Sequence, residues 1–198
     1  RSALREHEIS FIPPIFVATI TDDCNLRCPT CLYLLEDTNK FTHSYMRPDK
    51  LYQVLEKYNK ERKAEIIFLS GGEPLLHPEL DEIVGICKDY NAAVKISTNG
   101  ILMQENISAL LKLDYVNVSI DGYDYESYKN YRGGTQKQFD SVIEGVAELK
   151  KTGIHFSISY LLMIKNLCAI ERMIGLAEKI KPDFVSFHNI NPHGCREY

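Results

Sequence analysis

Apolar, β-branched runs alternate with longer segments of helical periodicity along most of the chain. Six apolar runs indicate strands, at residues 15–20, 65–69, 93–97, 115–120, 155–162 and 183–188. Five segments between these runs repeat apolar residues at helical spacing, at 48–60, 78–90, 104–113, 139–152 and 167–180. Strands that alternate with helices pair in parallel through right-handed crossovers. The pattern predicts an α/β fold with six parallel strands, whose near-continuous apolar runs are buried on both faces.

Length, charge and hydropathy exclude several classes of protein. The chain has 198 residues, which suits one domain with a real core. Its net charge of −4 argues against a generic nucleic-acid binder, and no apolar run approaches the roughly 18 residues that span a bilayer. The first eight residues are too charged for a secretory signal, so we expect a cytoplasmic protein. Residues 1–14 are predicted to be an N-terminal extension, and residues 15–198 the core domain.

Polar, glycine-rich clusters follow four of the predicted strands, at residues 70–74, 97–100, 119–122 and 189–194. In parallel α/β sheets and barrels, the carboxyl ends of the strands carry the active site. We therefore expect these clusters to converge on one rim, which is the layout of an enzyme.

Three cysteines lie in the loop after the first predicted strand, with the spacing C-x3-C-x2-C: Cys24, Cys28 and Cys31. Three thiolates on one short loop can surround a single metal centre, and this kind of spacing is typical of iron–sulfur ligation. A closed zinc site would need a fourth ligand, for which the next candidate along the chain is His43. A four-iron cluster with three ligands leaves one iron open to a reactant. Three reduced, incidental thiols are the remaining alternative.

At these cysteines the chain resembles the radical S-adenosylmethionine (radical SAM) enzymes, of the type related to SPASM- or twitch-containing and molybdopterin-forming members. Gly71-Gly72-Glu73-Pro74 follows the second predicted strand, as that family's GGE motif does. The resemblance runs from about residue 17 to 194. Its further matches are Ser97-Thr98-Asn99-Gly100, Ser119-Ile120-Asp121-Gly122, and Tyr131-Arg132-Gly133-Gly134 with Phe139 downstream.

The resemblance implies an open partial (β/α)6 barrel with a [4Fe–4S] cluster on Cys24, Cys28 and Cys31. It implies that SAM binds the open iron and is cleaved by one electron to a 5′-deoxyadenosyl radical, which abstracts hydrogen from an unidentified peptide or small metabolite. A reductant such as flavodoxin or ferredoxin is expected as a partner, and no nucleic acid or membrane. The alternative is an iron–sulfur or zinc protein that uses the cysteines for structure, electron transfer or partner binding without SAM chemistry.

Four residues are candidates for direct contact with SAM. Gly71 and Gly72 let the backbone approach a ligand closely, and Glu73 is expected to accept hydrogen bonds from the SAM ammonium. The same segment also suits an ordinary strand-to-helix turn. By resemblance, Arg132 pairs with the SAM carboxylate, for which its planar fork is suited. A solvated surface charge is the alternative for Arg132.

Three further candidates lie at the predicted rim. By resemblance, Ser119 lies near the ribose and methionine end of SAM, and a local cap is its alternative. Ser97 and Asn99 lie beside it, with turn chemistry equally able to explain Asn99 before a glycine. Thr98 is expected to face substrate.

One position departs from the family's pattern, and three cysteines outside the loop have their own predicted roles. Many family members have an aromatic residue just before the third cysteine, where this chain has Thr30. Cys87 is expected in the core and Cys168 in the core or on the surface. By resemblance, Cys195 is a candidate ligand of an auxiliary cluster in a longer protein, since related members with SPASM or twitch extensions place such ligands beyond this point. The chain ends after its sixth predicted strand and before a sixth helix. We therefore expect a core truncated after strand 6. His188 and His193 are candidates for substrate contact.

Overall fold

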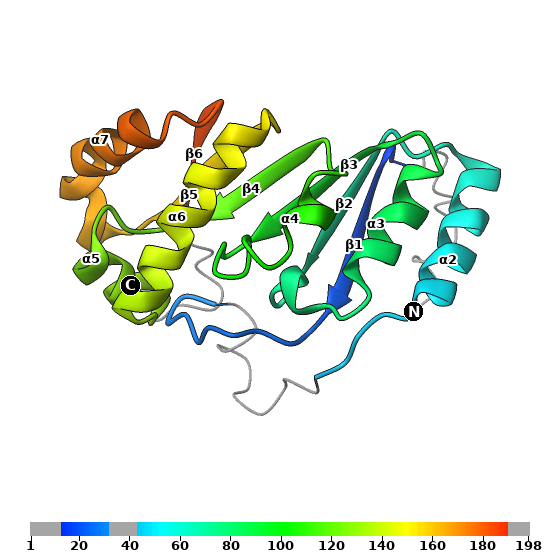
Figure 1. Cartoon of the computed structure of the whole chain (residues 1–198), viewed down its shortest axis with the longest axis horizontal. Helices are drawn as coiled ribbons and strands as arrows, with labels where there is room; N and C mark the ends of the chain where they lie inside the picture. Colours follow the sequence, from blue (N-terminus) through cyan, green and yellow to red (C-terminus); the bar gives the residue numbers. More distant parts are fainter. Residues whose placement is uncertain (1–12, 32–42, 190–198) are drawn as a thin grey trace, which may run out of the picture.

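The computed structural model describes residues 13–31 and 43–189 of the chain. Within these ranges, six parallel strands form one sheet in the order β1-β2-β3-β4-β5-β6, so that β1 and β6 are its two edges (Figure 1). The strands are β1 (Ile15–Thr21), β2 (Ile66–Gly71), β3 (Ala93–Thr98), β4 (Tyr115–Ser119), β5 (Phe156–Leu162) and β6 (Phe184–Asn189). The α/β fold with an unclosed barrel is confirmed.

Helices follow one another around the outside of the sheet, from α2 beside β1 to α7 beside β6 (Figure 1). They are α2 (Pro48–Glu61), α3 (Leu80–Lys88), α4 (Ile107–Leu110), α5 (Tyr125–Arg132), α6 (Gln136–Thr152) and α7 (Ile170–Ile180). Two 3-10 helices, η1 (Pro74–Leu76) and η2 (Ile164–Ala169), lie between strand and helix after β2 and β5. All five predicted helices are present, although the segment at 104–113 contributes only the single turn of α4.

Helix α5 was not predicted, because its sequence has no apolar stripe. Only Ser127 and Tyr128 are buried on it. Its local signals are instead at its ends: Asp124 and Ser127 form a capping box, and Gly133 ends the helix with a positive φ of 70°. These end signals stabilise a helix that carries Arg132 to the rim of the sheet.

The composition of the strands predicted burial on both faces. In the structure, most of the strands are instead buried on one face only. Burial alternates along β1 to β4, as at Val94 and Ile96, which are fully buried, and Lys95 and Ser97, which are half-buried. The buried face packs against the helices and forms the core, together with apolar residues such as Leu51 of α2. The other face lines the concave side of the sheet and is largely polar at its carboxyl end. Only the first part of β5 is buried on both faces.

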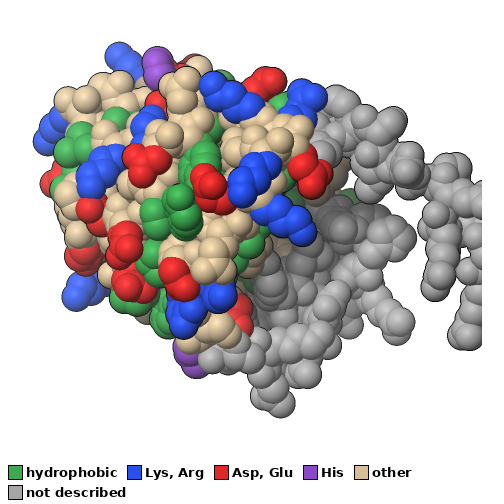
Figure 2. Space-filling view, turned by 90° about the vertical axis from the view of Figure 1, so that its right-hand side faces the viewer, with side chains coloured by type: hydrophobic (Ala, Val, Ile, Leu, Met, Phe, Trp, Pro, Cys, Tyr) green, Lys and Arg blue, Asp and Glu red, His purple; other side chains and the backbone are tan. Residues whose placement is uncertain are grey.

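The outer surface mixes charges of both signs. On the side of the molecule where α2 lies, Lys and Arg side chains are interspersed with Asp and Glu (Figure 2). None of the helices in the described ranges is long and apolar enough to cross a bilayer. The division at residue 14 stays a prediction: β1 begins at Ile15, and residues 1–12 lie outside the described ranges.

Candidate active site

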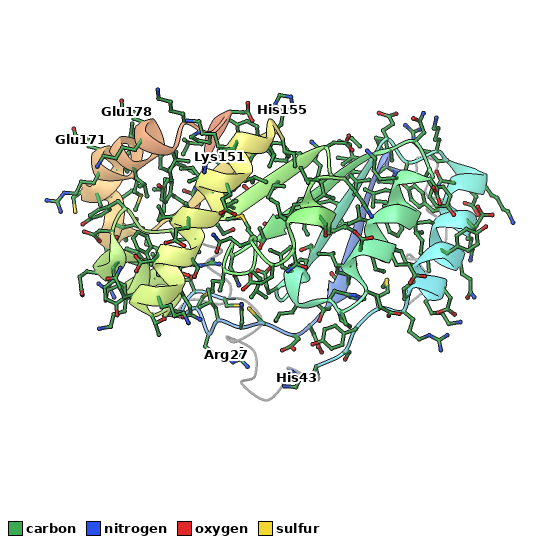
Figure 3. The ribbon with its side chains drawn as sticks, in the orientation of Figure 1. Arg27, His43, Lys151, His155, Glu171 and Glu178 are labelled. Atoms are coloured by element: carbon green, nitrogen blue, oxygen red, sulfur yellow. The ribbon has the colours of Figure 1, made fainter. Side chains whose placement is uncertain are left out.

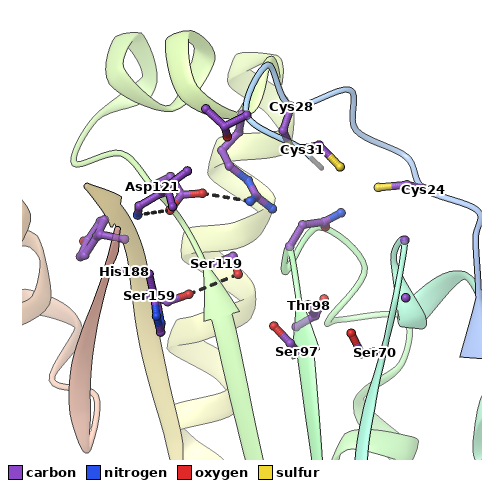
Figure 4. A pocket seen from close by; sticks show the side chains of 17 residues that line it. Cys24, Cys28, Cys31, Ser70, Ser97, Thr98, Ser119, Asp121, Ser159 and His188 are labelled. Atoms are coloured by element: carbon purple, nitrogen blue, oxygen red, sulfur yellow. Dashed lines mark hydrogen bonds and ion pairs between the residues drawn. The ribbon is translucent and has the colours of Figure 1, made fainter. Parts of the chain in front are cut away.

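A cavity of about 340 Å³ lies at the carboxyl ends of the strands (Figure 4). The three cysteines of the loop after β1 form one side of it, and residues at the ends of β2 to β6 form the rest. Figure 3 shows Arg27 and His43 at this end of the molecule and Lys151 and His155 at the opposite end. The lining includes Cys24, Cys28, Thr30, Cys31, Gly71, Gly72, Ser97, Asn99, Ser119, Asp121, Arg132, Ser159 and His188. The predicted convergence on one rim is therefore present.

The cysteine loop is held by its own backbone and by Arg27. The Arg27 guanidinium donates hydrogen bonds to the carbonyls of Cys24 (2.6 Å) and Leu26 (2.9 Å), and the N–H of Cys31 donates to the carbonyl of Cys28 (3.0 Å). All three cysteines are free thiols. Burial raises the pKa of the Cys28 thiol to about 11, against which the positive charge of Arg132 acts. A bound metal centre would outweigh this burial, because coordination deprotonates a thiol.

Gly71 and Gly72 bring the turn after β2 against the backbone that leads into the cysteine loop. The N–H of Gly72 donates to the carbonyl of Thr21 (2.8 Å), and the N–H of Glu73 donates to the carbonyl of Asp23 (2.7 Å). A Cβ added at either glycine would lie 2.2 Å from one of these two carbonyl oxygens. The close approach that the glycines allow is therefore first to the protein's own backbone, beside the cavity that both of them line.

The Glu73 carboxylate is engaged within the protein and is not part of the cavity lining, and the expectation that it meets the SAM ammonium stays a prediction. Glu73 is 1% exposed, and its two oxygens accept hydrogen bonds from the N–H groups of Leu75 (3.0 Å) and Asn99 (2.6 Å) and from the Thr98 hydroxyl (2.6 Å). Burial raises the pKa of Glu73, and these hydrogen bonds act in the opposite direction. The carboxylate thus ties the turn after β2 to the end of β3.

Thr98 and Asn99 are engaged in the same network. The Thr98 hydroxyl donates to Glu73 and accepts from the N–H of Gly100 (3.0 Å). Thr98 also lines the cavity, and the expectation that it faces substrate stays a prediction. The side-chain amide of Asn99 donates to the side-chain oxygen of Asn25 (2.7 Å), which lies between the first two cysteines. The sequence pointed to Asn99, but its partner Asn25 was missed because nothing in its local pattern distinguishes it.

A belt of neutral hydroxyl and amide groups crosses the concave face of the sheet below the cysteines. The Asn117 amide donates to Ser97 (3.1 Å) and Ser159 (3.3 Å), and the Ser159 hydroxyl donates to that of Ser119 (3.2 Å). Ser157 also donates to the Asn117 side-chain oxygen (2.8 Å). The two predicted serines, Ser97 and Ser119, therefore lie in one cross-strand network that lines the cavity.

A buried ion pair closes the side of the cavity near Cys28. Arg132 Nη1 lies 2.9 Å from Asp121 Oδ2, and the two side chains are 14% and 8% exposed. Asp121 Oδ1 accepts a hydrogen bond from the N–H of Leu161 (2.7 Å). The solvated surface position considered for Arg132 is thus wrong. Asp121 is a functional candidate to which the sequence analysis gave no role beyond its place in the segment from Ser119 to Gly122.

Among the described residues, no three His, Cys, Asp or Glu side chains, the three cysteines included, are placed to hold a single metal ion. His43, the nearest candidate for a fourth zinc ligand, lies with Nδ1 2.8 Å from Asp23 Oδ1. Asp23 also accepts from the N–H of Cys24 (2.8 Å) and from the Tyr45 hydroxyl (2.6 Å), so this carboxylate fastens the return of the chain beside the cysteine loop.

The other candidates within the described residues lie in the cavity lining, in the core or on the surface. Thr30 and His188 line the cavity. Cys87 is fully buried in the core, as predicted, and Cys168 is exposed. Cys195 and His193 lie outside the described residues.

The sequence matches the Radical SAM superfamily over residues 18–177, which include every residue of the cavity lining except His188. The chain belongs to the radical SAM superfamily. Its predicted family and enzyme class are thereby confirmed, and so are the family's cofactors, a [4Fe–4S] cluster and SAM. The alternative of a zinc or iron–sulfur protein without SAM chemistry is not favoured.

Curated relatives of this radical SAM chain carry several names. It is 29% identical to a probable GTP 3′,8-cyclase of Sulfurisphaera tokodaii over 180 residues, which cover 89% of this chain and 56% of the relative. It is also 29% identical to the AdoMet-dependent heme synthase of Methanosarcina barkeri, over 85% of this chain and 48% of the relative. The chain thus spans about half the length of the curated relatives it matches.

Solved structures share the radical SAM fold. Streptococcus suis SuiB bound to the precursor peptide SuiA has a TM-score of 0.78 and 18% identity, over 94% of this chain and 43% of SuiB. Native anSMEcpe with bound AdoMet has a TM-score of 0.75 and 20% identity, over 89% of this chain and 51% of anSMEcpe. At these identities the likeness concerns the fold alone.

The residues present fit the family's cofactors. Three thiols of one loop line the cavity, which suits a cluster with one open iron better than a closed site. In addition, Arg132 Nε is buried without a hydrogen-bond partner among the described residues. A buried unpaired donor beside the cysteines fits an anionic group bound in this cavity.

Proposed function

We propose that this chain is a catalytic core that binds a [4Fe–4S] cluster through Cys24, Cys28 and Cys31 and cleaves SAM reductively. The observation that carries the proposal is the cavity that these three thiols share with residues at the strand ends. When bound, the cluster supplies an open iron and one electron for cleavage of the sulfonium, which gives a 5′-deoxyadenosyl radical. The protein's own part is to hold, orient and shield the reactants.

Direct contacts to SAM fall to groups that line the cavity. The backbone of Gly71 and Gly72 lies at its wall beside the cysteine loop and is proposed to meet the amino group. Arg132 supplies the cation for the SAM carboxylate, because its Nε has no partner among the described residues. Ser119 is proposed to contact the ribose and methionine end, with Ser97 beside it in the same hydroxyl network.

Glu73 and Asn99 are proposed to act on the loop rather than on SAM. The buried Glu73 carboxylate orders the backbone of Leu75 and Asn99, and the Asn99 amide then holds Asn25 within the cysteine loop. Such groups keep a binding site within a fraction of an ångström of its productive geometry.

The substrate is proposed to be a peptide or a small metabolite, and the reductant a flavodoxin or ferredoxin. SuiB, one of the structural neighbours, was solved bound to the precursor peptide SuiA, and this supports the proposal of a peptide substrate. The net charge of −4 and the mixed charges in Figure 2 support the proposal that nucleic acid is not a partner. A cytoplasmic location also stays a proposal, supported by the five free thiols among the described cysteines.

Anaerobic reconstitution tests the function. The loaded protein is expected to bind about four irons per chain, and with dithionite and SAM to release 5′-deoxyadenosine. Cys28→Ala is expected to lose the cluster and the product, whereas Cys87→Ala is the matched control, since Cys87 is buried in the core away from the cavity. No product from a folded, iron-loaded wild type would contradict the proposal.

A further inference from the structure

Asp121 stands at the end of β4 in a backbone conformation that non-glycine residues rarely adopt. Its φ is 55°, in the left-handed region, where aspartate is among the better tolerated side chains. Ser119 is the last residue of β4, so this left-handed residue turns the chain immediately beyond the strand. One carboxylate oxygen then accepts from the N–H of Leu161 on the neighbouring strand, which fixes the carboxylate against the end of β5.

The second oxygen of the same carboxylate holds Arg132. The contact runs from Asp121 Oδ2 to Arg132 Nη1 alone (2.9 Å), which leaves the guanidinium with further N–H groups. Arg132 is the last residue of α5, and the glycine that follows it packs against the cysteine loop: a Cβ on Gly133 would lie 3.1 Å from the carbonyl oxygen of Arg27. The helix end, the ion pair and the loop therefore form one assembly.

The charge of Arg132 lies beside the cysteine loop. Arg132 lines the same cavity as Cys24 and Cys28, and the glycine that follows it packs against the carbonyl of Arg27 in that loop. The guanidinium is also almost enclosed, so solvent screens its charge weakly. Asp121 offsets part of that positive charge at a distance of one hydrogen bond.

We propose that Asp121 is a positioning residue that holds Arg132 at the cysteine loop, and that the two charges of this ion pair shift the reduction potential of the bound cluster in opposite directions. The inference rests on the proposed function, because it requires the cluster. Reduction adds one negative charge to the cluster, so a nearby cation stabilises the reduced form and a nearby anion destabilises it. With both charges present, the potential is expected to lie below the value with Arg132 alone and above the value with Asp121 alone.

Redox titration of the reconstituted protein without SAM, followed by electron paramagnetic resonance, tests this. Asp121→Asn removes the anion and is expected to raise the potential, whereas Arg132→Gln removes the cation and is expected to lower it. The double variant is expected to return close to the wild type, and Arg132→Lys, which keeps the charge, to stay near it. These opposite shifts are a readout that loss of stability alone does not produce.

Matched controls come from the other end of β4. Asp114 immediately precedes this strand and pairs with Lys88 (2.8 Å), roughly 20 Å from Asp121 along the strand direction. Asp114→Asn and Lys88→Gln change the same charges and are expected to leave the potential unchanged. Equal potentials in Asp121→Asn, Arg132→Gln and the wild type, or shifts in the same direction, would overturn the inference.

Failure of the proposed function and failure of this inference give different experimental results. A wild type that never forms an iron–sulfur cluster contradicts the function. A loaded wild type whose variants do not shift contradicts only the role of the ion pair. If Asp121→Asn fails to load, Arg132→Gln and Arg132→Lys still test the charge of Arg132: a lowered potential in the first alone supports its effect on the cluster, and equal potentials overturn the inference.

Discussion

The side-chain amide of Asn99 donates a 2.7 Å hydrogen bond to the side-chain oxygen of Asn25, two residues that are 74 positions apart in the sequence. This bond joins the end of β3 to the short segment between Cys24 and Cys28. Because the backbone of Asn99 is itself held by the buried Glu73 carboxylate, the cysteine loop is anchored indirectly to the turn after β2. The geometry of the cysteine loop thus depends on Asn99 and Glu73, which lie outside it.

Asn99→Ala is expected to loosen the cysteine loop. The variant leaves the Asn25 oxygen without its partner, which costs roughly 1–3 kcal/mol in the free energy of unfolding. The loaded variant is expected to release iron to a chelator several-fold faster than the wild type. Asn59→Ala is the control, since the hydrogen bonds of Asn59 within the described residues go to the carbonyl of Leu55 and the N–H of Ala64, away from the cavity. Equal iron release in both variants would show that the loop does not depend on Asn99.

Gly72→Ala is expected to prevent correct seating of the loop. A Cβ at this position would lie 2.2 Å from the carbonyl oxygen of Asp23, which is backbone and has no side-chain freedom to give way. We expect a large loss of thermal stability and of iron content. Gly85→Ala in α3 is the control, because no atom lies within 4 Å of its added Cβ, and alanine stabilises a helix by about 0.4–1 kcal/mol. A normally loaded Gly72→Ala protein would contradict this packing.

Asp114→Asn is expected to reduce stability in a pH-dependent way. Burial alone would raise the pKa of Asp114, but the Lys88 ammonium and the N–H of Val94 hold it below its ordinary 3.8. Its stabilising contribution is therefore present above pH 3.8 and is lost as pH falls through the lower pKa of the folded state.

Urea unfolding of the metal-free protein measures this contribution. The difference between the wild type and Asp114→Asn is expected to be about 1 kcal/mol near neutral pH and to shrink below pH 3.8. Asp81→Asn, which removes an exposed ion pair with Lys112, is expected to change stability little. A difference that does not vary with pH would contradict the assignment.

The strands and most helices could be predicted because their signals are local. A short apolar run such as residues 66–69 indicates a buried strand by its own composition, and spacing alone marks the cysteine loop. Helix α5 was not predicted because its apolar pattern is weak and its signals lie in the caps at Asp124 and Gly133. The concave face was also misjudged: residues such as Lys95 and Ser97 alternate with buried neighbours, but flanking apolar residues masked the alternation.

Partners within the site could not be predicted because they are distant in sequence. Glu73 has the chemistry to meet an ammonium, and only the fold reveals that three protein donors surround it instead. Asp121 is a common turn residue, and its contact with Leu161 spans 40 positions. Sequence motifs identify which residues gather at the rim, whereas their division between ligand contact and support depends on the packing of several strand ends.

Glu73→Gln separates those two roles for the carboxylate. All three of its partners donate, so an amide NH2 in place of one oxygen would face an N–H or O–H donor in a buried site. We expect a loss of roughly 1–3 kcal/mol in the free energy of unfolding, with little change in the SAM affinity of the protein that still loads its cluster. Urea unfolding and equilibrium dialysis with labelled SAM measure the two quantities. A loss of SAM affinity at unchanged stability would instead place the Glu73 carboxylate in contact with the SAM ammonium.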